Sequence, residues 1–268
     1  MAEYLINARY YQQFDAAIEA EVPGEGYGGW QAAPIEISRE HTAVVVMHAW
    51  DTGTEADYPG WYRAVEYMPR AREIGERILP GLLAAVRASE VPLFHVVGSG
   101  DYYREYPGYL RTVKIAGEPE SAPERLAADP VLERLRAWRR QKVFVGAHNT
   151  ADVQQGFAKL DFMPQARPEG EEGIAENSQQ LAALCREAGV NHLIYAGFAI
   201  NWCLLLSPGG MAEMSQRGAM CSALLQAVTA VENRETARNE LCKEIAPWRV
   251  ALAFGFVFAV EDFVAAIA

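Results

Sequence analysis

Apolar residues dominate six short stretches of the chain, and one of these, residues 42–48, is a continuous run of the kind found in strands buried on both faces of a parallel sheet. The intervening segments carry helical spacing or helix-forming composition, broken by prolines and by an SPGG turn. We therefore expect an α/β fold in which helices cover both faces of a mainly parallel sheet. The expected strands are residues 42–48, 91–97, 143–147, 191–198, 220–227 and 251–258, and the expected helices are residues 64–88, 123–140, 176–188, 203–218, 228–244 and 261–267.

The first 40 residues differ from the rest, because they are rich in Tyr, Glu, Pro and Gly. They predict an irregular N-terminal arm with one short helix. The aromatic side chains of this arm need cover, either from the domain or from a second subunit, and we therefore expect a homo-oligomer, most simply a two-fold dimer. No internal repeat or low-complexity linker interrupts residues 41–268, which predict a single domain.

Composition and net charge limit which binding partners and which cellular compartment we expect. A net charge of −11 over 268 residues argues against nucleic acid and anionic membranes as partners. The N-terminus lacks the basic and apolar regions of a signal peptide, and the longest apolar run is shorter than a membrane helix. Four widely spaced cysteines without a CxxC pair indicate reduced thiols in a cytoplasmic protein, with neither a disulfide framework nor a zinc site.

Ligands of parallel α/β sheets bind outside the carboxyl ends of the strands. Three of the predicted strand ends carry candidate side chains and should converge on one cleft: residues 47–51, 96–103 and 197–203. The predicted pocket residues are Trp50, Asp101, Tyr102 and Tyr103. Several aromatic side chains at one cleft favour a flat or apolar small-molecule substrate. The alternative is that some of them are ordinary packing residues.

Cys203 stands just after a predicted strand and at the first turn of a predicted helix. The positive end of a helix dipole lowers a thiol pKa, and backbone N–H groups there can hold an oxyanion. The alternative is a buried structural cysteine. Cys185, Cys221 and Cys242 fall on apolar faces and are expected in the core.

The segment "NHLIYAGFAINWCLLLSPGGMAEMSQRG" resembles the isochorismatase-like cysteine hydrolases, as do "TAVVVMHAWD" and "QQLAALCREAGV". The resemblance covers most of the chain beyond the arm and implies a three-layer Rossmann-like fold with a six-stranded, mainly parallel sheet. It also implies hydrolysis of a small amide or related acyl compound through a thioester on Cys203, without a cofactor. Members of this family hold a cis peptide bond near the oxyanion site, which here falls between Phe198 and Ala199.

Two positions depart from the family pattern. His48 stands where the family has its catalytic Asp, and Glu176 or Asn177 lies nearest the position of its catalytic Lys. The Asp-x-His metal motif of some members is replaced by Asp101 followed by tyrosines, so no metal site is expected. One hypothesis makes His48 the base for Cys203, oriented by Glu176 or Asp51. The other is a catalytically lapsed relative that binds a small molecule or a protein partner.

Overall fold

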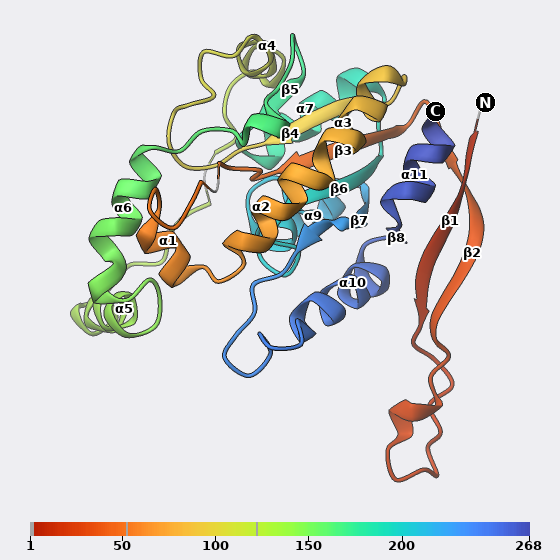
Figure 1. The fold of residues 1–268 in the computed structure, drawn as a ribbon, viewed down its shortest axis with the longest axis horizontal. Coiled ribbons are helices and arrows are strands. Elements are labelled where there is room, and N and C mark those ends of the chain that lie inside the picture. Colours follow the sequence, from red (N-terminus) through yellow and green to blue (C-terminus); the bar gives the residue numbers. More distant parts are fainter. Residues whose placement is uncertain (1–2, 52, 122) are drawn as a thin grey trace.

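The computed structural model describes residues 3–51, 53–121 and 123–268. Its centre is an eight-stranded sheet in the order β2-β1-β8-β7-β6-β3-β4-β5, visible in Figure 1. The strands from β8 to β5 are parallel, whereas β1 pairs antiparallel with both β2 and β8. The strands are β1 (Glu3–Gln12), β2 (Gly29–Ser38), β3 (Thr42–Met47), β4 (Leu93–Val96), β5 (Gly173–Ala175), β6 (His192–Phe198), β7 (Met220–Thr229) and β8 (Val257–Phe258).

Helices connect the parallel strands, as expected for right-handed crossovers between them. The α-helices are α1 (Pro59–Ala64), α2 (Met68–Arg77), α3 (Leu79–Ala88), α4 (Pro107–Ala116), α5 (Pro130–Lys142), α6 (Thr150–Ala158), α7 (Ser178–Ala188), α8 (Cys203–Leu206), α9 (Met211–Gln216), α10 (Leu241–Ala253) and α11 (Val260–Ile267). Short 3-10 helices occur at η1 (Pro23–Gly26), η2 (Ala147–Asn149) and η3 (Pro164–Ala166). No helix in the described ranges is both long and apolar enough to cross a membrane.

The central strand β3 contributes to two hydrophobic cores, one on each face of the sheet. Val44 and Val46 pack in the core formed with α2, α3 and α11. Val45 and Met47 belong to the opposite core, formed with α7, α9 and α10. This two-sided burial explains why β3 is a continuous apolar run, and it confirms the predicted three-layer α/β fold.

The expectation of an irregular N-terminal arm and a six-stranded sheet is wrong. Residues 3–38 form a β-hairpin whose first strand pairs with β8, so the six parallel strands gain two antiparallel ones. The physical reason is a two-residue alternation: Tyr4, Ile6 and Ala8 are buried between exposed neighbours. Figure 1 shows the hairpin running along one edge of the body and projecting beyond it.

Three local predictions also need correction. Residues 143–147 form no strand: residues 143–146 form a turn in which Phe144 lies exposed, and η2 begins at Ala147. The strand β7 continues to Thr229, so the helix predicted from residue 228 begins only at Leu241. That helix then runs on to Ala253, which leaves only Val257–Phe258 of the last predicted strand.

Candidate active site around Cys203

The turn that carries Cys203 is fixed to the end of the neighbouring strand β7. The side chain of Asn201 accepts a hydrogen bond from the Val231 N–H at 2.9 Å and donates one to the Val231 carbonyl at 2.8 Å. The Ile200 N–H donates to the Thr229 carbonyl at 2.9 Å. These bonds hold Cys203 at the carboxyl edge of the sheet, where parallel α/β proteins bind their ligands.

Cys203 is the first residue of α8, as predicted, but this helix has only four residues. A single turn sums few peptide dipoles, so the helix dipole gives the thiol less support than a long helix gives. The peptide bond between Phe198 and Ala199 is cis, the geometry that the family resemblance implies. Another cis bond joins Phe144 to Val145.

Two backbone amides beside the thiol are without an acceptor. The N–H groups of Trp202 and Leu204 both donate to the Ala199 carbonyl at 3.1 Å. By contrast, the N–H groups of Ala199 and Cys203 find no acceptor among the described residues, although both residues line a cavity. Amides of this kind can stabilise the oxyanion that forms when a thiolate attacks a carbonyl carbon.

Cys203 differs from the other cysteines in its surroundings. Cys185 and Cys221 are buried, and burial raises the pKa of each thiol to about 12. Cys242 is half-buried and lies 3.4 Å from the Thr236 hydroxyl. Cys203 is also half-buried, but it faces the cavity at the sheet edge.

This cavity, of about 780 Å³, has the size of small-molecule sites. Its walls are largely aromatic and aliphatic, and its rim carries arginines from α5. The residues around it are Trp50, Ala64, Val65, Tyr67, Arg136, Arg139, Arg140, Val143, Phe144, Phe157, Ala199, Trp202, Cys203, Val231 and Glu232.

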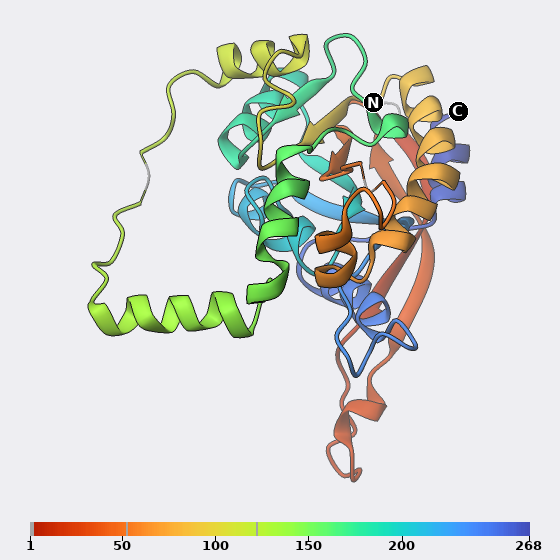
Figure 2. The same cartoon turned by 60° about the vertical axis from the view of Figure 1, so that its left-hand side comes forward.

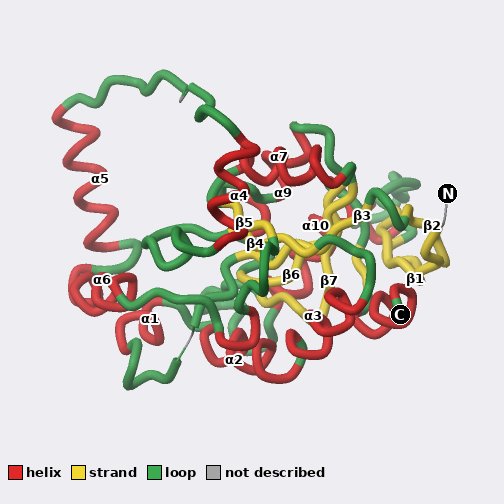
Figure 3. Tube along the Cα trace, turned by 90° about the horizontal axis from the view of Figure 1, so that it is seen from above, coloured by secondary structure: helices red, strands yellow, loops and turns green. Residues whose placement is uncertain are grey.

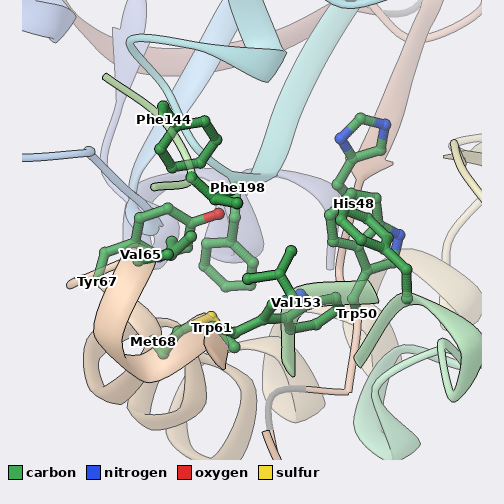
Figure 4. Close-up of a pocket in the computed structure, with 12 residues that line it drawn as sticks. His48, Trp50, Trp61, Val65, Tyr67, Met68, Phe144, Val153 and Phe198 are labelled. Atoms are coloured by element: carbon green, nitrogen blue, oxygen red, sulfur yellow. The ribbon is translucent and has the colours of Figure 1, made fainter. Parts of the chain in front are cut away.

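A smaller inner pocket of about 90 Å³ lies next to the cavity, with which it shares Trp50, Val65, Tyr67 and Phe144 among its walls. His48 lines only this inner part. Figure 4 shows His48 and Trp50 on one side of the inner pocket and Val65, Tyr67 and Phe144 on the other. The thiol and the imidazole therefore line different pockets, and no hydrogen bond joins them among the described residues.

His48 follows β3 with a φ of 50°, a left-handed conformation that is uncommon outside glycine and that stores strain. Its ring stacks on Trp50, its Nε2 faces Gly98, and its Nδ1 is buried without a hydrogen-bond partner among the described residues. Burial lowers the pKa of His48 to about 4, so the imidazole is neutral at pH 7.

The hydrogen bonds expected of a triad are not formed in the described part of the chain. The Glu176 carboxylate accepts from the Tyr103 hydroxyl at 2.7 Å and lies 3.7 Å from the Arg104 guanidinium. The Asp51 carboxylate accepts from the Gly53 N–H at 2.9 Å, which closes a local turn. Both carboxylates thus have partners other than His48, because each is held by its own loop.

Of the four residues predicted for the pocket, Trp50 is the one that lines the cavity in the described structure. Its Nε1 donates to the Tyr102 hydroxyl at 2.9 Å, so Tyr102 supports the wall from behind. Tyr103 is buried against Tyr109, and Asp101 is exposed in a turn. Among the described residues, no three His, Cys, Asp or Glu side chains gather where they could hold a metal ion.

Tyr67, which no sequence pattern indicated as a site residue, precedes α2 and lines both the cavity and the inner pocket. Burial raises the pKa of Tyr67, and a negative charge on nearby Cys203 raises it further. Tyr67 therefore remains a neutral hydroxyl beside the thiol. The predicted helix over residues 64–88 hid this position, although the proline that follows Met68 marks a helix start.

No family model and no curated protein matches this sequence. Among solved structures, the chain is similar to a cysteine hydrolase from Pseudomonas syringae pv. phaseolicola, with 15% identity over 86% of this chain and 94% of that chain and a TM-score of 0.48. An isochorismatase-like hydrolase from Alkaliphilus metalliredigens shows 15% identity over 84% of this chain and 97% of that chain, with a TM-score of 0.47. An isochorismatase family protein from Burkholderia thailandensis shows 14% identity over 86% of this chain and 97% of that chain, with a TM-score of 0.43.

Proposed function

We propose that this protein is a hydrolase that cleaves a small amide or related acyl compound through the Cys203 thiolate. The sulfur attacks the acyl carbon, the bond to the leaving group breaks, and the leaving group departs with a proton. Water then hydrolyses the thioester, which releases the acid and restores the thiol. This is the nucleophilic sequence that splits one difficult step into two easier ones.

One observation carries the proposal. Cys203 faces a substrate-sized cavity at the carboxyl edge of the sheet, and the N–H groups of Ala199 and Cys203 beside it have no acceptor among the described residues. A nucleophile next to unpaired amide donors is the arrangement that acyl transfer requires.

His48 is the proposed proton acceptor for the thiol. Its ring is neutral at pH 7 and its Nδ1 has no partner within the described residues, so a lone pair is free to accept the proton, although a pKa of about 4 makes the imidazole a weak base. Tyr67 is proposed to donate its hydroxyl proton in a hydrogen bond to the reacting group, since its raised pKa keeps that proton in place. Glu176 and Asp51 then support the loops around the site rather than the imidazole.

The cavity walls favour a substrate with an apolar or aromatic acyl part. Trp50 and Phe144 present aromatic surface in both the cavity and the inner pocket. Arg139 and Arg140 stand at the rim and favour a negatively charged group on the part of the substrate that stays near solvent.

A second function, binding without turnover, is favoured by a different observation. Glu232 is the carboxylate that lines the cavity in the described structure, and it accepts hydrogen bonds from the Cys242 and Lys243 N–H groups at 3.0 and 2.9 Å. It therefore caps α10 and is not available as a base for Cys203. A site with a nucleophile but a weak base can retain a ligand without converting it.

A panel of amides, anilides and thioesters with aromatic or aliphatic acyl groups tests both functions, with Cys203→Ser as the matched control. A hydrolase releases acid from at least one compound, and the serine variant loses at least ~100-fold in rate, because the nucleophile is replaced by a much weaker one. Binding without turnover gives saturable quenching of tryptophan fluorescence by panel members, no acid, and the same affinity in the serine variant.

A further inference from the structure

The β1–β2 hairpin ends in a tip, residues 13–28, that extends past the rest of the chain, as Figures 1 and 2 show. Contacts that tie the hairpin to the body stop at the base of this tip. There the Trp248 Nε1 donates to the Gln13 side chain at 2.9 Å, and Tyr11 packs edge-on against Trp248. The tip is ordered by its own backbone bonds, such as that from the Ala17 N–H to the Pro23 carbonyl at 2.9 Å.

The tip exposes apolar side chains beside acidic ones. Ile18 is 75% exposed, and Phe14 and Val22 are 56% and 52% exposed. Residues 13–28 also carry four acidic side chains and no lysine or arginine; the acidic residues are Asp15, Glu19, Glu21 and Glu25. Apolar residues gathered at a projecting tip are uncommon on a surface that meets only water.

The helix α5 is the second projecting element. It follows an extended segment in which residues 117–121 and 123–130 are all exposed, and no residue of α5 itself is buried. Figure 2 shows α5 held away from the body at the end of this segment, and Figure 3 shows the same separation from above. Val131, Leu135 and Trp138 are 54%, 58% and 59% exposed, and their spacing places them on one face of the helix.

The two faces of α5 have different surroundings. Arg136, Arg139 and Arg140 line the Cys203 cavity. The face with Val131, Leu135 and Trp138 also carries Arg134 and Lys142 by helical spacing. Over its 13 residues α5 has five basic side chains and one acidic side chain, in a chain whose net charge is −11. The helix α5 therefore presents a basic, partly apolar surface on an acidic protein.

We propose that the hairpin tip of one copy of this chain docks on the outer face of α5, the face with Val131, Leu135 and Trp138, of a second copy. The two surfaces match in two independent respects: each presents three exposed apolar side chains, and their charges are opposite. They lie at separate ends of one chain in Figures 1 and 2, so a second copy is what brings them together. In a two-fold dimer the contact occurs twice.

The contact also bears on the cavity, although the proposal does not depend on the proposed function. Docking buries the outer face of α5 and thereby restrains a helix that also supplies Arg136, Arg139 and Arg140 to the cavity lining. Burial of the apolar side chains supplies the attraction, and the opposite charges select the register and speed the encounter.

Sedimentation velocity of the full chain at micromolar concentration tests the proposal, with paired charge reversals on each surface. Glu19→Lys/Glu21→Lys on the tip and Arg134→Glu/Lys142→Glu on α5 should each weaken self-association at least tenfold. Combining all four substitutions in one chain should restore the dimer, because the charges are then exchanged. Glu90→Lys/Glu235→Lys, which changes two exposed acids elsewhere, should have no effect.

A second pair of variants removes the apolar contact without a charge change. Phe14→Ser/Ile18→Ser and Leu135→Ser/Trp138→Ser alter side chains that are exposed in the single chain, so each should remain folded by circular dichroism and become monomeric. A wild-type chain that sediments as a monomer overturns the proposal. A dimer that persists in the tip variants and in the α5 variants also overturns it. So does a monomeric chain that carries all four charge reversals.

Discussion

The imidazole of His48 stacks on the indole of Trp50, with ring centroids 4.6 Å apart and planes inclined by 13°. The stacking holds the ring at the wall of the inner pocket, while the buried Nδ1 is left without a partner among the described residues. An unpaired buried polar atom costs about 1–3 kcal/mol of folding free energy. Together with the left-handed backbone of His48, this is the kind of cost that proteins carry at functional positions.

Replacing His48 by Asn tests its role as base, because asparagine tolerates the left-handed backbone but lacks an imidazole. We expect the alkylation rate of Cys203 by iodoacetamide at pH 7 to fall roughly tenfold or more, as for loss of a general base. The matched control is His192→Asn: burial also lowers the pKa of His192 to about 4, but its Nε2 pairs with Ser222 away from the cavity. Equal rates in both variants would remove His48 from the mechanism.

The buried histidines also predict how stability depends on pH. Burial lowers the pKa of His48 from 6.5 to about 4, so the unfolded state binds more protons than the folded state between these values. The free energy of unfolding should therefore be full above pH 6.5 and decline as the pH falls toward 4, by roughly 3 kcal/mol for this residue. Urea unfolding should show a shallower decline in His48→Asn and an unchanged one in His148→Asn, whose histidine is exposed.

The Glu172 carboxylate pairs with a second buried imidazole, that of His95, which the proposed mechanism does not use. It lies 2.8 Å from the His95 Nε2 and 2.6 Å from the Arg87 Nε. Burial raises the pKa of Glu172, but these hydrogen bonds outweigh it and lower the pKa to about 2. Glu172→Gln should cost about 2–4 kcal/mol of unfolding free energy, because it leaves Arg87 and the buried His95 without their half-buried carboxylate partner.

The control for this change is Glu169→Gln, which removes the more exposed partner of Arg87 and should cost below about 1 kcal/mol. Neither variant should alter the alkylation rate of Cys203, since both residues lie outside the cavity in the described structure. A large effect of Glu172→Gln on the thiol, at a temperature where the protein stays folded, would connect this cluster to the site.

The arginines at the cavity rim should make Cys203 react preferentially with anionic reagents. Arg139→Ala/Arg140→Ala should lower the alkylation rate with anionic iodoacetate relative to neutral iodoacetamide by roughly threefold to tenfold, because a local positive potential concentrates anions. The ratio of the two rates cancels changes in thiol reactivity itself. Arg125→Ala/Arg238→Ala removes the same charge elsewhere and should leave the ratio unchanged; an equal change in both variants would exclude a local effect.

The parts of the fold that the sequence predicted are those in which a local pattern and burial agree. The runs that became β3 and β6 are buried along their whole length, so their apolar character was unambiguous. The strand β1 was missed because the apolar Leu5 at an exposed position obscures its alternation, and because a glycine-rich tip follows it. Residues 143–147 were wrongly predicted as a strand, because their apolar side chains line the cavity rim instead of packing in a sheet.

The candidate site likewise contains some residues that the sequence predicted and others that it did not. Cys203, Trp50 and the Phe198–Ala199 turn follow strand ends, so their position at the cleft was readable from topology. Tyr67 and Phe144 enter the cavity from loops and helix starts whose direction depends on tertiary packing. The partners of Glu176 and Asp51 were likewise hidden, because Tyr103 and Gly53 reach those carboxylates through loop conformations that no sequence spacing specifies.

The central claim is that Cys203 forms a thioester that the protein then hydrolyses, and intact-mass spectrometry of a single turnover tests it most directly. Wild-type protein mixed with an activated aromatic acyl ester should gain the mass of one acyl group within the first turnover. Peptide mapping should place that group on Cys203, and the adduct should disappear as free acid accumulates. A chain that never gains the acyl mass, that gains it on Cys242 instead, or that keeps it on Cys203 without releasing acid would contradict the claim.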